Sequence, residues 1–126
     1  MAALAVLHAR LVVTFLLFFG ALSIWGFFSY LRGRSISGSY KGALAIGELL
    51  MLAEFVLGVL LLLGGAQPYR PSIHILYGIV AIIGLPGAFA YTRGRDDRWE
   101  LLIYVTVCLF LCGIALRALT TGRVPT

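Results

Sequence analysis

Four long apolar segments, separated by short polar ones, constrain this chain more than any other feature of its sequence. They run from about residue 11 to 31, 42 to 64, 73 to 91 and 99 to 119. A helix of about 20 apolar residues spans the hydrocarbon core of a bilayer. The chain has 126 residues, 61% of them hydrophobic, and no soluble domain fits beside the four segments. The sequence therefore predicts an all-α membrane protein in which residues 1–126 form a single integral membrane domain.

The connections between the segments are too short for anything but antiparallel neighbours, which predicts a four-helix up-down bundle. The exits of the first and third segments also resemble each other. Residues 28–34 read FSYLRGR and residues 89–95 read FAYTRGR, with five of seven positions identical. This match suggests two parallel helical-hairpin repeats. Convergence explains it equally well, because aromatic residues followed by Arg suit the inner end of any membrane-spanning helix.

The distribution of Lys and Arg predicts the orientation of the bundle. Six of these residues follow the first and third segments, and four lie on the opposite side. The six are Arg32, Arg34, Lys41, Arg93, Arg95 and Arg98, and the four are Arg10, Arg70, Arg117 and Arg123. Because short basic loops favour the cytoplasm, loops 32–41 and 92–98 are predicted to be cytoplasmic and both termini to lie outside. Topology and anionic headgroups explain the net charge of +5, so no nucleic-acid partner is expected.

Three polar residues inside the segments need partners in a membrane. Glu48 and Glu54 lie in the second segment, and Arg117 lies near the end of the fourth. Charged groups at this depth are costly, so they face the bundle interior or another subunit. Six residues on a helix correspond to about 240° of rotation, so the two glutamates do not share a face. They are expected to bond another helix or a partner subunit rather than to form a paired-carboxylate site. A proton or quinone role for Glu54 is the alternative.

The best candidate for a ligand site is the start of the third segment. His74 and Tyr77 lie one turn apart on one helix face, where they suit the headgroup of a quinone or a lipid. His8 precedes the first segment and should lie near the same membrane face. His8 and His74 are therefore the alternative pair of axial ligands for a haem b. Each histidine also has an ordinary explanation as an interfacial residue.

The sequence offers no catalytic residue. It contains no P-loop, no G-x-S-x-G and no H-E-x-x-H motif. Cys108 and Cys112 lie one turn apart in the fourth segment and suit buried core positions, so no metal site is predicted. Pro86 should bend the third helix. The chain itself is thus expected to carry no cofactor, with haem b or quinone as the alternative.

Three stretches carry a resemblance to a known group of proteins. They read PSIHILYG at 71–78, AYTRGRDDRWE at 90–100 and CGIALRALTTG at 112–122. In these stretches the chain resembles small four-helix membrane proteins of filamentous phototrophic bacteria, and in particular the accessory membrane subunit of alternative complex III. The resemblance implies a bacterial inner (plasma) membrane protein that packs against other integral membrane subunits and lipids beside a quinol site. It transfers no catalytic residue.

These observations together predict a non-catalytic accessory subunit of a larger electron-transport membrane complex of the quinol-oxidising type. Two alternatives stay open from the residues. One is a membrane redox protein that binds haem b or quinone. The other is a small transporter or proton carrier that uses Glu54.

Overall fold

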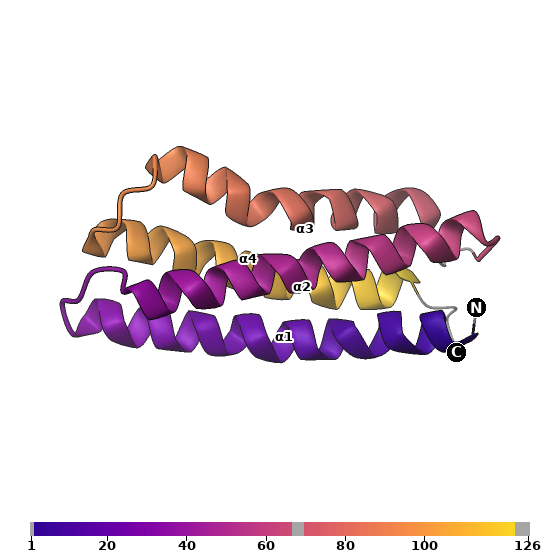
Figure 1. Ribbon diagram of the computed structural model, residues 1–126, viewed down its shortest axis with the longest axis horizontal. Coiled ribbons are helices and arrows are strands. Elements are labelled where there is room, and N and C mark those ends of the chain that lie inside the picture. The colour runs from indigo at the N-terminus through magenta and orange to yellow at the C-terminus, as the bar shows by residue number, and fades with distance from the viewer. Residues whose placement is uncertain (1, 67–69, 123–126) are drawn as a thin grey trace.

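The computed structural model describes residues 2–66 and 70–122, with the side chains of 120–122 left out, and within them the chain forms four helices and no strand. The helices are α1 (Ala2–Leu31), α2 (Gly38–Leu63), α3 (Pro71–Thr92) and α4 (Arg98–Gly122). They lie side by side along one long axis (Figure 1). All four are long and apolar enough to cross a membrane, so the chain is a multi-pass membrane protein. The predicted fold class is confirmed. Arg123, counted in the charge bias, lies outside the described residues.

The first helix is longer than its apolar segment. It begins at Ala2, nine residues before the predicted start at residue 11, whereas the other helix ends fall within about one turn of their predicted positions. Residues 2–7 are alanine, leucine and valine, which favour or tolerate a helix. Arg10 is exposed on the surface of the helix. The arginine therefore marks a polar position on the helix surface and not the helix end.

Helices α1 and α3 end at equivalent positions of the repeated sequence. Leu31 closes α1 and Thr92 closes α3, and each of these residues is the fourth in its seven-residue match. Gly33 and Gly94 follow two residues later, and both have φ +73°. Glycine adopts this left-handed conformation without strain. The two exits still differ, because Arg93 also has a positive φ of 55° and the N–H of Gly94 donates to the Phe89 carbonyl, whereas the N–H of Gly33 donates to the Tyr30 carbonyl.

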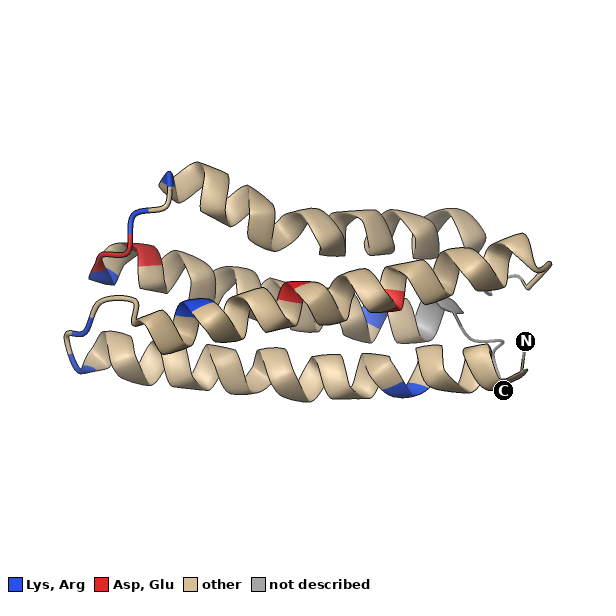
Figure 2. Cartoon of the chain, in the orientation of Figure 1, with Lys and Arg blue, Asp and Glu red and all other residues tan. Residues whose placement is uncertain are grey.

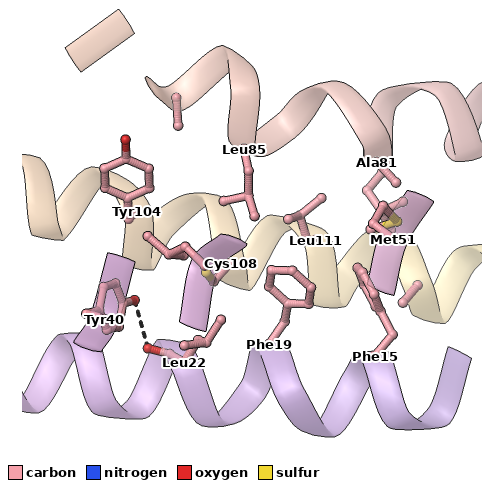
Figure 3. Packing of buried hydrophobic residues seen from close by; sticks show 14 of the residues in the cluster. Phe15, Phe19, Leu22, Tyr40, Met51, Ala81, Leu85, Tyr104, Cys108 and Leu111 are labelled. Carbon is pink, nitrogen blue, oxygen red and sulfur yellow. Dashed lines mark hydrogen bonds between the residues drawn. The ribbon is translucent and has the colours of Figure 1, made fainter. Parts of the chain in front are cut away.

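The bundle is closed into a ring in which each helix packs against its chain neighbours and α4 packs against α1. The α1–α4 pair is the most extensive of the four and the α2–α3 pair is the least. Phe19 of α1 and Leu111 and Cys108 of α4 are completely buried where these helices meet (Figure 3). The core is therefore built mainly on α1 and α4, while α2 and α3 keep most of their surface outside the bundle.

Helices α1, α2 and α4 approach one another closely around Gly26, and this contact fixes one part of the core. The Tyr40 hydroxyl of α2 donates a hydrogen bond of 2.9 Å to the carbonyl oxygen of Leu22 in α1 (Figure 3). Gly26 lies beside it, and a Cβ atom there would stand 2.6 Å from the Tyr40 hydroxyl and 2.5 Å from Cγ2 of Val105 in α4. Glycine at this position is what allows the three helices to meet.

Most of the charged residues gather at one end of the bundle, which we call the basic end and define by loops 32–37 and 93–97 (Figure 2). Lys41 Nζ lies 2.9 Å from Asp96 Oδ2, and Arg95 Nε lies 2.8 Å from Glu100 Oε1. The backbone N–H of Ile36 donates to the Asp96 carbonyl and joins the two loops. The hydrogen bond from Lys41 lowers the pKa of the Asp96 carboxyl. This ion pair therefore persists at neutral pH and is lost only as the pH falls through that lowered pKa.

Replacing Ser37 by alanine is expected to destabilise the start of α2. Its side chain accepts a hydrogen bond of 3.1 Å from the backbone N–H of Tyr40 and so caps the helix. Loss of such a cap costs about 1 kcal/mol. Thermal unfolding of the detergent-solubilised protein measures the change. Ser37→Asp, which restores a capping oxygen, should recover most of it, and equal loss in both variants would show that the cap contributes nothing.

Candidate functional site

The candidate site is a cavity of about 400 Å³ at the end of the bundle opposite the basic end, lined by residues from all four helices. We call this end of the bundle the histidine end. Most of the lining is aliphatic or aromatic. The polar side chains that line it are His8 of α1, Glu54 of α2, and His74 and Tyr77 of α3. A mostly apolar pocket with a few convergent polar groups is typical of a small-molecule site.

The central feature of the cavity is an ion pair between α1 and α2. His8 Nδ1 lies 3.0 Å from Glu54 Oε1, and the side chains are 24% and 13% exposed. Apart from this contact, neither atom has a hydrogen-bond partner in the described part of the chain. The two groups therefore lie at ion-pair distance in an apolar surrounding, where an isolated charge would be costly, and both atoms keep the capacity for a further hydrogen bond.

The His8 ring packs against the backbone of α2 at Gly58. Gly58 follows Glu54 by four residues and so lies on the same helix face. A Cβ atom at Gly58 would stand 3.1 Å from His8 Cε1. The imidazole thus packs against bare backbone while its Nδ1 faces the carboxylate one turn away. The Glu54–Gly58 spacing both places the ring and orients it.

His74 brings a second imidazole to the same place. The centroids of the two histidine rings lie 6.3 Å apart, with an angle of 70° between the planes. The backbone of Ala118 in α4 hydrogen-bonds the His74 ring. Tyr77 lies one turn further along α3 and lines the same cavity. Two imidazoles, one carboxylate and one phenol hydroxyl therefore converge from three helices.

Not all predicted site residues share this cavity. The structure brings together His8, His74, Tyr77 and Glu54. Glu48 lines a separate cavity closer to the basic end, which agrees with its position on another face of α2. Arg117 lies on an exposed face of α4 and is absent from the lining of either cavity. Glu54 and Glu48 thus line two different cavities, and Arg117 lies on the surface of α4.

The pairing of His8 with Glu54 is the feature that sequence reasoning missed. The predicted start of the first helix at residue 11 leaves His8 outside the helix, whereas Glu54 lies well inside the second segment of residues 42 to 64. With α1 beginning at Ala2, His8 lies about 9 Å inside the helix. Glu54 lies about 14 Å from the end of α2 at Leu63, so the two side chains can meet. Counting from the helix ends, rather than from the apolar segments, would have suggested the pair.

The chemistry available here is hydrogen bonding and proton exchange. Among the described residues, no group of three or more His, Cys, Asp or Glu side chains could hold a metal ion. Histidine and glutamate can each bind or release a proton, and the tyrosine hydroxyl can donate or accept a hydrogen bond. The cavity therefore suits an amphipathic ligand whose polar head exchanges hydrogen bonds with these groups and whose remainder is apolar.

Comparison of the chain with models of protein families, with curated proteins and with solved structures finds no match. The resemblance to the accessory subunit of alternative complex III therefore stays a prediction.

Proposed function

We propose that this protein is an integral membrane subunit that binds a quinone or quinol headgroup in the cavity at the histidine end. The observation that carries the proposal is the His8–Glu54 contact of 3.0 Å inside an apolar cavity, with a second imidazole 6.3 Å from the first. A quinone has an apolar ring and tail and two oxygens that accept hydrogen bonds. Its quinol form donates hydrogen bonds from the same two oxygens.

The residues can serve both redox forms of such a ligand. His74 and Tyr77 lie on one face of α3. The Tyr77 hydroxyl can donate to a quinone oxygen, and the ring nitrogen of His74 that does not face Ala118 donates when the ring is protonated and accepts from a quinol when it is neutral. The Glu54 carboxylate can accept a hydrogen bond from a quinol hydroxyl, and so can Nε2 of His8 when that ring is neutral. Because the walls are mostly apolar, each of these bonds is stronger than it would be in water. The site therefore favours a ligand that has hydrogen-bonding oxygens on its headgroup and is otherwise apolar.

An accessory role in a larger electron-transport complex fits this chemistry. The chain has two cysteines, and a cysteine-ligated iron–sulfur cluster needs four. We propose that electrons exchanged with a bound quinone pass to or from a redox centre on another subunit. We propose a bacterial plasma membrane location with the basic end in the cytoplasm, as the positive-inside rule predicts. Native mass spectrometry of the gently extracted complex tests the subunit role, since a lone monomer with no partner would contradict it.

Purified protein is expected to bind a short-chain quinone analogue, and His74→Phe is expected to weaken this binding about tenfold. The phenylalanine keeps the ring volume but removes the hydrogen bond, and such a loss costs about 1.4 kcal/mol. Tyr77→Phe should weaken binding several-fold. Titration of the detergent-solubilised protein with the analogue, followed by calorimetry, gives the Kd.

The matched control for Tyr77→Phe is Tyr91→Phe. Tyr91 is 74% exposed near the basic end and lies outside the cavity. Its variant should bind the analogue as the unmodified protein does. The proposal is wrong if the unmodified protein binds no more analogue than empty detergent micelles do, or if Tyr91→Phe and Tyr77→Phe weaken binding equally.

Haem b is the second candidate ligand, and one observation favours it. Haem-ligating and metal-ligating histidines hold the second ring nitrogen in a hydrogen bond to a carboxylate or backbone carbonyl. Here His8 faces Glu54 and His74 contacts the backbone of Ala118, while the rings are 6.3 Å apart. The absorption spectrum of the reduced, purified protein decides this candidate, because a bis-histidine haem b gives an α-band and quinone gives none.

A further inference from the structure

The second cavity, nearer the basic end, has the features of a binding site of its own. Its volume is about 330 Å³, and it lies on the α2–α3 side of the bundle, where helix packing is weakest. Pro86 of α3 is in its wall, and α3 bends along its length (Figure 1). Leu44, Leu85 and Phe89 supply the apolar part of the lining. A cavity between two loosely packed membrane helices is open to lipid.

One wall of this cavity is a face of α2. Along this face the lining begins with the cation Lys41 and ends with the carboxyl of Glu48. Lys41, Leu44, Ala45 and Glu48 follow the helical spacing of three, four and seven residues and line the cavity together. Glu48 lies about 10 Å deeper than Lys41 along the helix. Figure 2 shows this polarity, with a basic position near the start of α2 and acidic positions further along it. The mouth is therefore cationic and the floor is a carboxyl.

The charges at the mouth are predominantly positive. Lys41 and Arg95 line the cavity, and their carboxylate partners Asp96 and Glu100 do not. Both cationic side chains are about half exposed, at 50% and 53%, so they can turn toward a second anion while they remain near the first. Long cationic side chains reach toward the membrane surface in this way.

The floor contains a polar atom that lacks a partner. Glu48 Oε1 is buried and makes no hydrogen bond to any described residue. The nearby Tyr104 hydroxyl is already 3.3 Å from Thr92 Oγ1. A buried carboxyl oxygen in this state needs either a ligand or a water molecule. In the neutral form, the carboxyl can donate a hydrogen bond to a carbonyl oxygen.

We propose that this cavity binds one anionic phospholipid. Its phosphate lies between Lys41 and Arg95, its glycerol ester carbonyl accepts a hydrogen bond from Glu48, and an acyl chain lies along Leu85 and Phe89. Phosphate and ester oxygens occur at successive depths of a lipid, as the cations and the carboxyl do along α2. Apolar walls, a cationic mouth at the membrane surface and a deeper hydrogen-bond donor fit this class of molecule. The inference is independent of the quinone site.

Retention of lipid by the purified protein tests the proposal. The protein is reconstituted with equal amounts of phosphatidylglycerol and phosphatidylcholine of the same acyl chains, extracted in mild detergent and weighed by native mass spectrometry. The unmodified protein should retain one phosphatidylglycerol in preference to phosphatidylcholine. The double variant K41Q/R95Q should lower this retention about tenfold. R34Q, which removes a cation at the same end but outside the cavity lining, should leave it unchanged.

Two variants of Glu48 test the floor of the site. Glu48→Gln keeps a hydrogen-bond donor and should retain the lipid, whereas Glu48→Leu should lose it several-fold. Circular dichroism confirms that each variant is folded, and the single variants K41Q and R95Q substitute for the double variant if that one does not fold. The proposal is overturned if phosphatidylcholine is retained as well as phosphatidylglycerol, if R34Q lowers retention as much as K41Q/R95Q, or if no lipid is retained.

Discussion

Gly26→Ala is expected to destabilise the bundle by about 2 to 3 kcal/mol. The new Cβ would stand 2.5 Å from Val105 Cγ2 and 2.6 Å from the Tyr40 hydroxyl, so either α1 moves away from α4 or the tyrosine leaves its position. Overpacking of this kind costs about 1 to 3 kcal/mol. Displacing the tyrosine also breaks its buried hydrogen bond to Leu22, which adds about 1 kcal/mol. Unfolding of the detergent-solubilised protein, followed by circular dichroism, measures the effect.

Gly20→Ala is the matched control in the same helix. No atom lies within 4 Å of a Cβ built at Gly20, so alanine there should be neutral or should stabilise α1 by a few tenths of a kcal/mol. Gly47→Ala provides a second test on α2, because its Cβ would stand 2.7 Å from Phe19 Cζ. It should behave like Gly26→Ala. Equal stability of the Gly20 and Gly26 variants would contradict the three-helix contact.

His8→Asn and Glu54→Gln are expected to be non-additive. Each variant alone leaves its buried partner without a countercharge, at an expected cost of about 1 to 3 kcal/mol in the free energy of unfolding. The double variant replaces both groups by neutral amides and should cost little more than either single change. A double-mutant cycle on thermal or denaturant unfolding gives the coupling energy, which should exceed about 0.5 kcal/mol. Additive effects would show that the 3.0 Å contact contributes nothing to stability.

Gly58→Ala tests the geometry of this pair without removing either group. The new Cβ would stand 3.1 Å from His8 Cε1 and displace the ring from the α2 backbone. Gly58→Ala should therefore weaken binding of the quinone analogue several-fold. Gly42→Ala is the control on the same helix, because nothing lies within 4 Å of its Cβ. Equal affinity of these two variants for the analogue would argue against His8 as a ligand-binding residue.

The fold could be predicted from the sequence because the signal is long and redundant. Each of the four apolar segments is sufficient to define a membrane-spanning helix, and short loops leave one connectivity. What could not be predicted is which helices pack tightly. The α1–α4 contact depends on the fit of Phe19, Leu111 and a few other side chains, and a pattern of uniformly apolar residues has no polar face to mark the interior.

The site could be predicted only in part. His74 and Tyr77 were identified from their one-turn spacing on a single helix. Glu54 was recognised as an unusual residue in a membrane, but its partner lies on another helix. Finding that partner requires the depth of His8 and the rotation of α1, and neither follows from composition. The depth depends on where α1 begins, and nothing in the first ten residues marks that start except Arg10, which lies on the helix surface.

The dominant contact between α1 and α4 has a consequence for biosynthesis. A ribosome delivers α1 first and α4 last, so the most extensive helix pair of the bundle forms only after the other three helices have been made. During that interval α1 packs on α2, where Phe19 lies against Gly47, but it lacks its α4 partner, and Gly26 has Tyr40 as a neighbour but not Val105. Insertion of α4 then closes the ring and completes both cavities, because each is lined in part by α4. A chain truncated before Arg98 therefore lacks the α4 wall of both cavities.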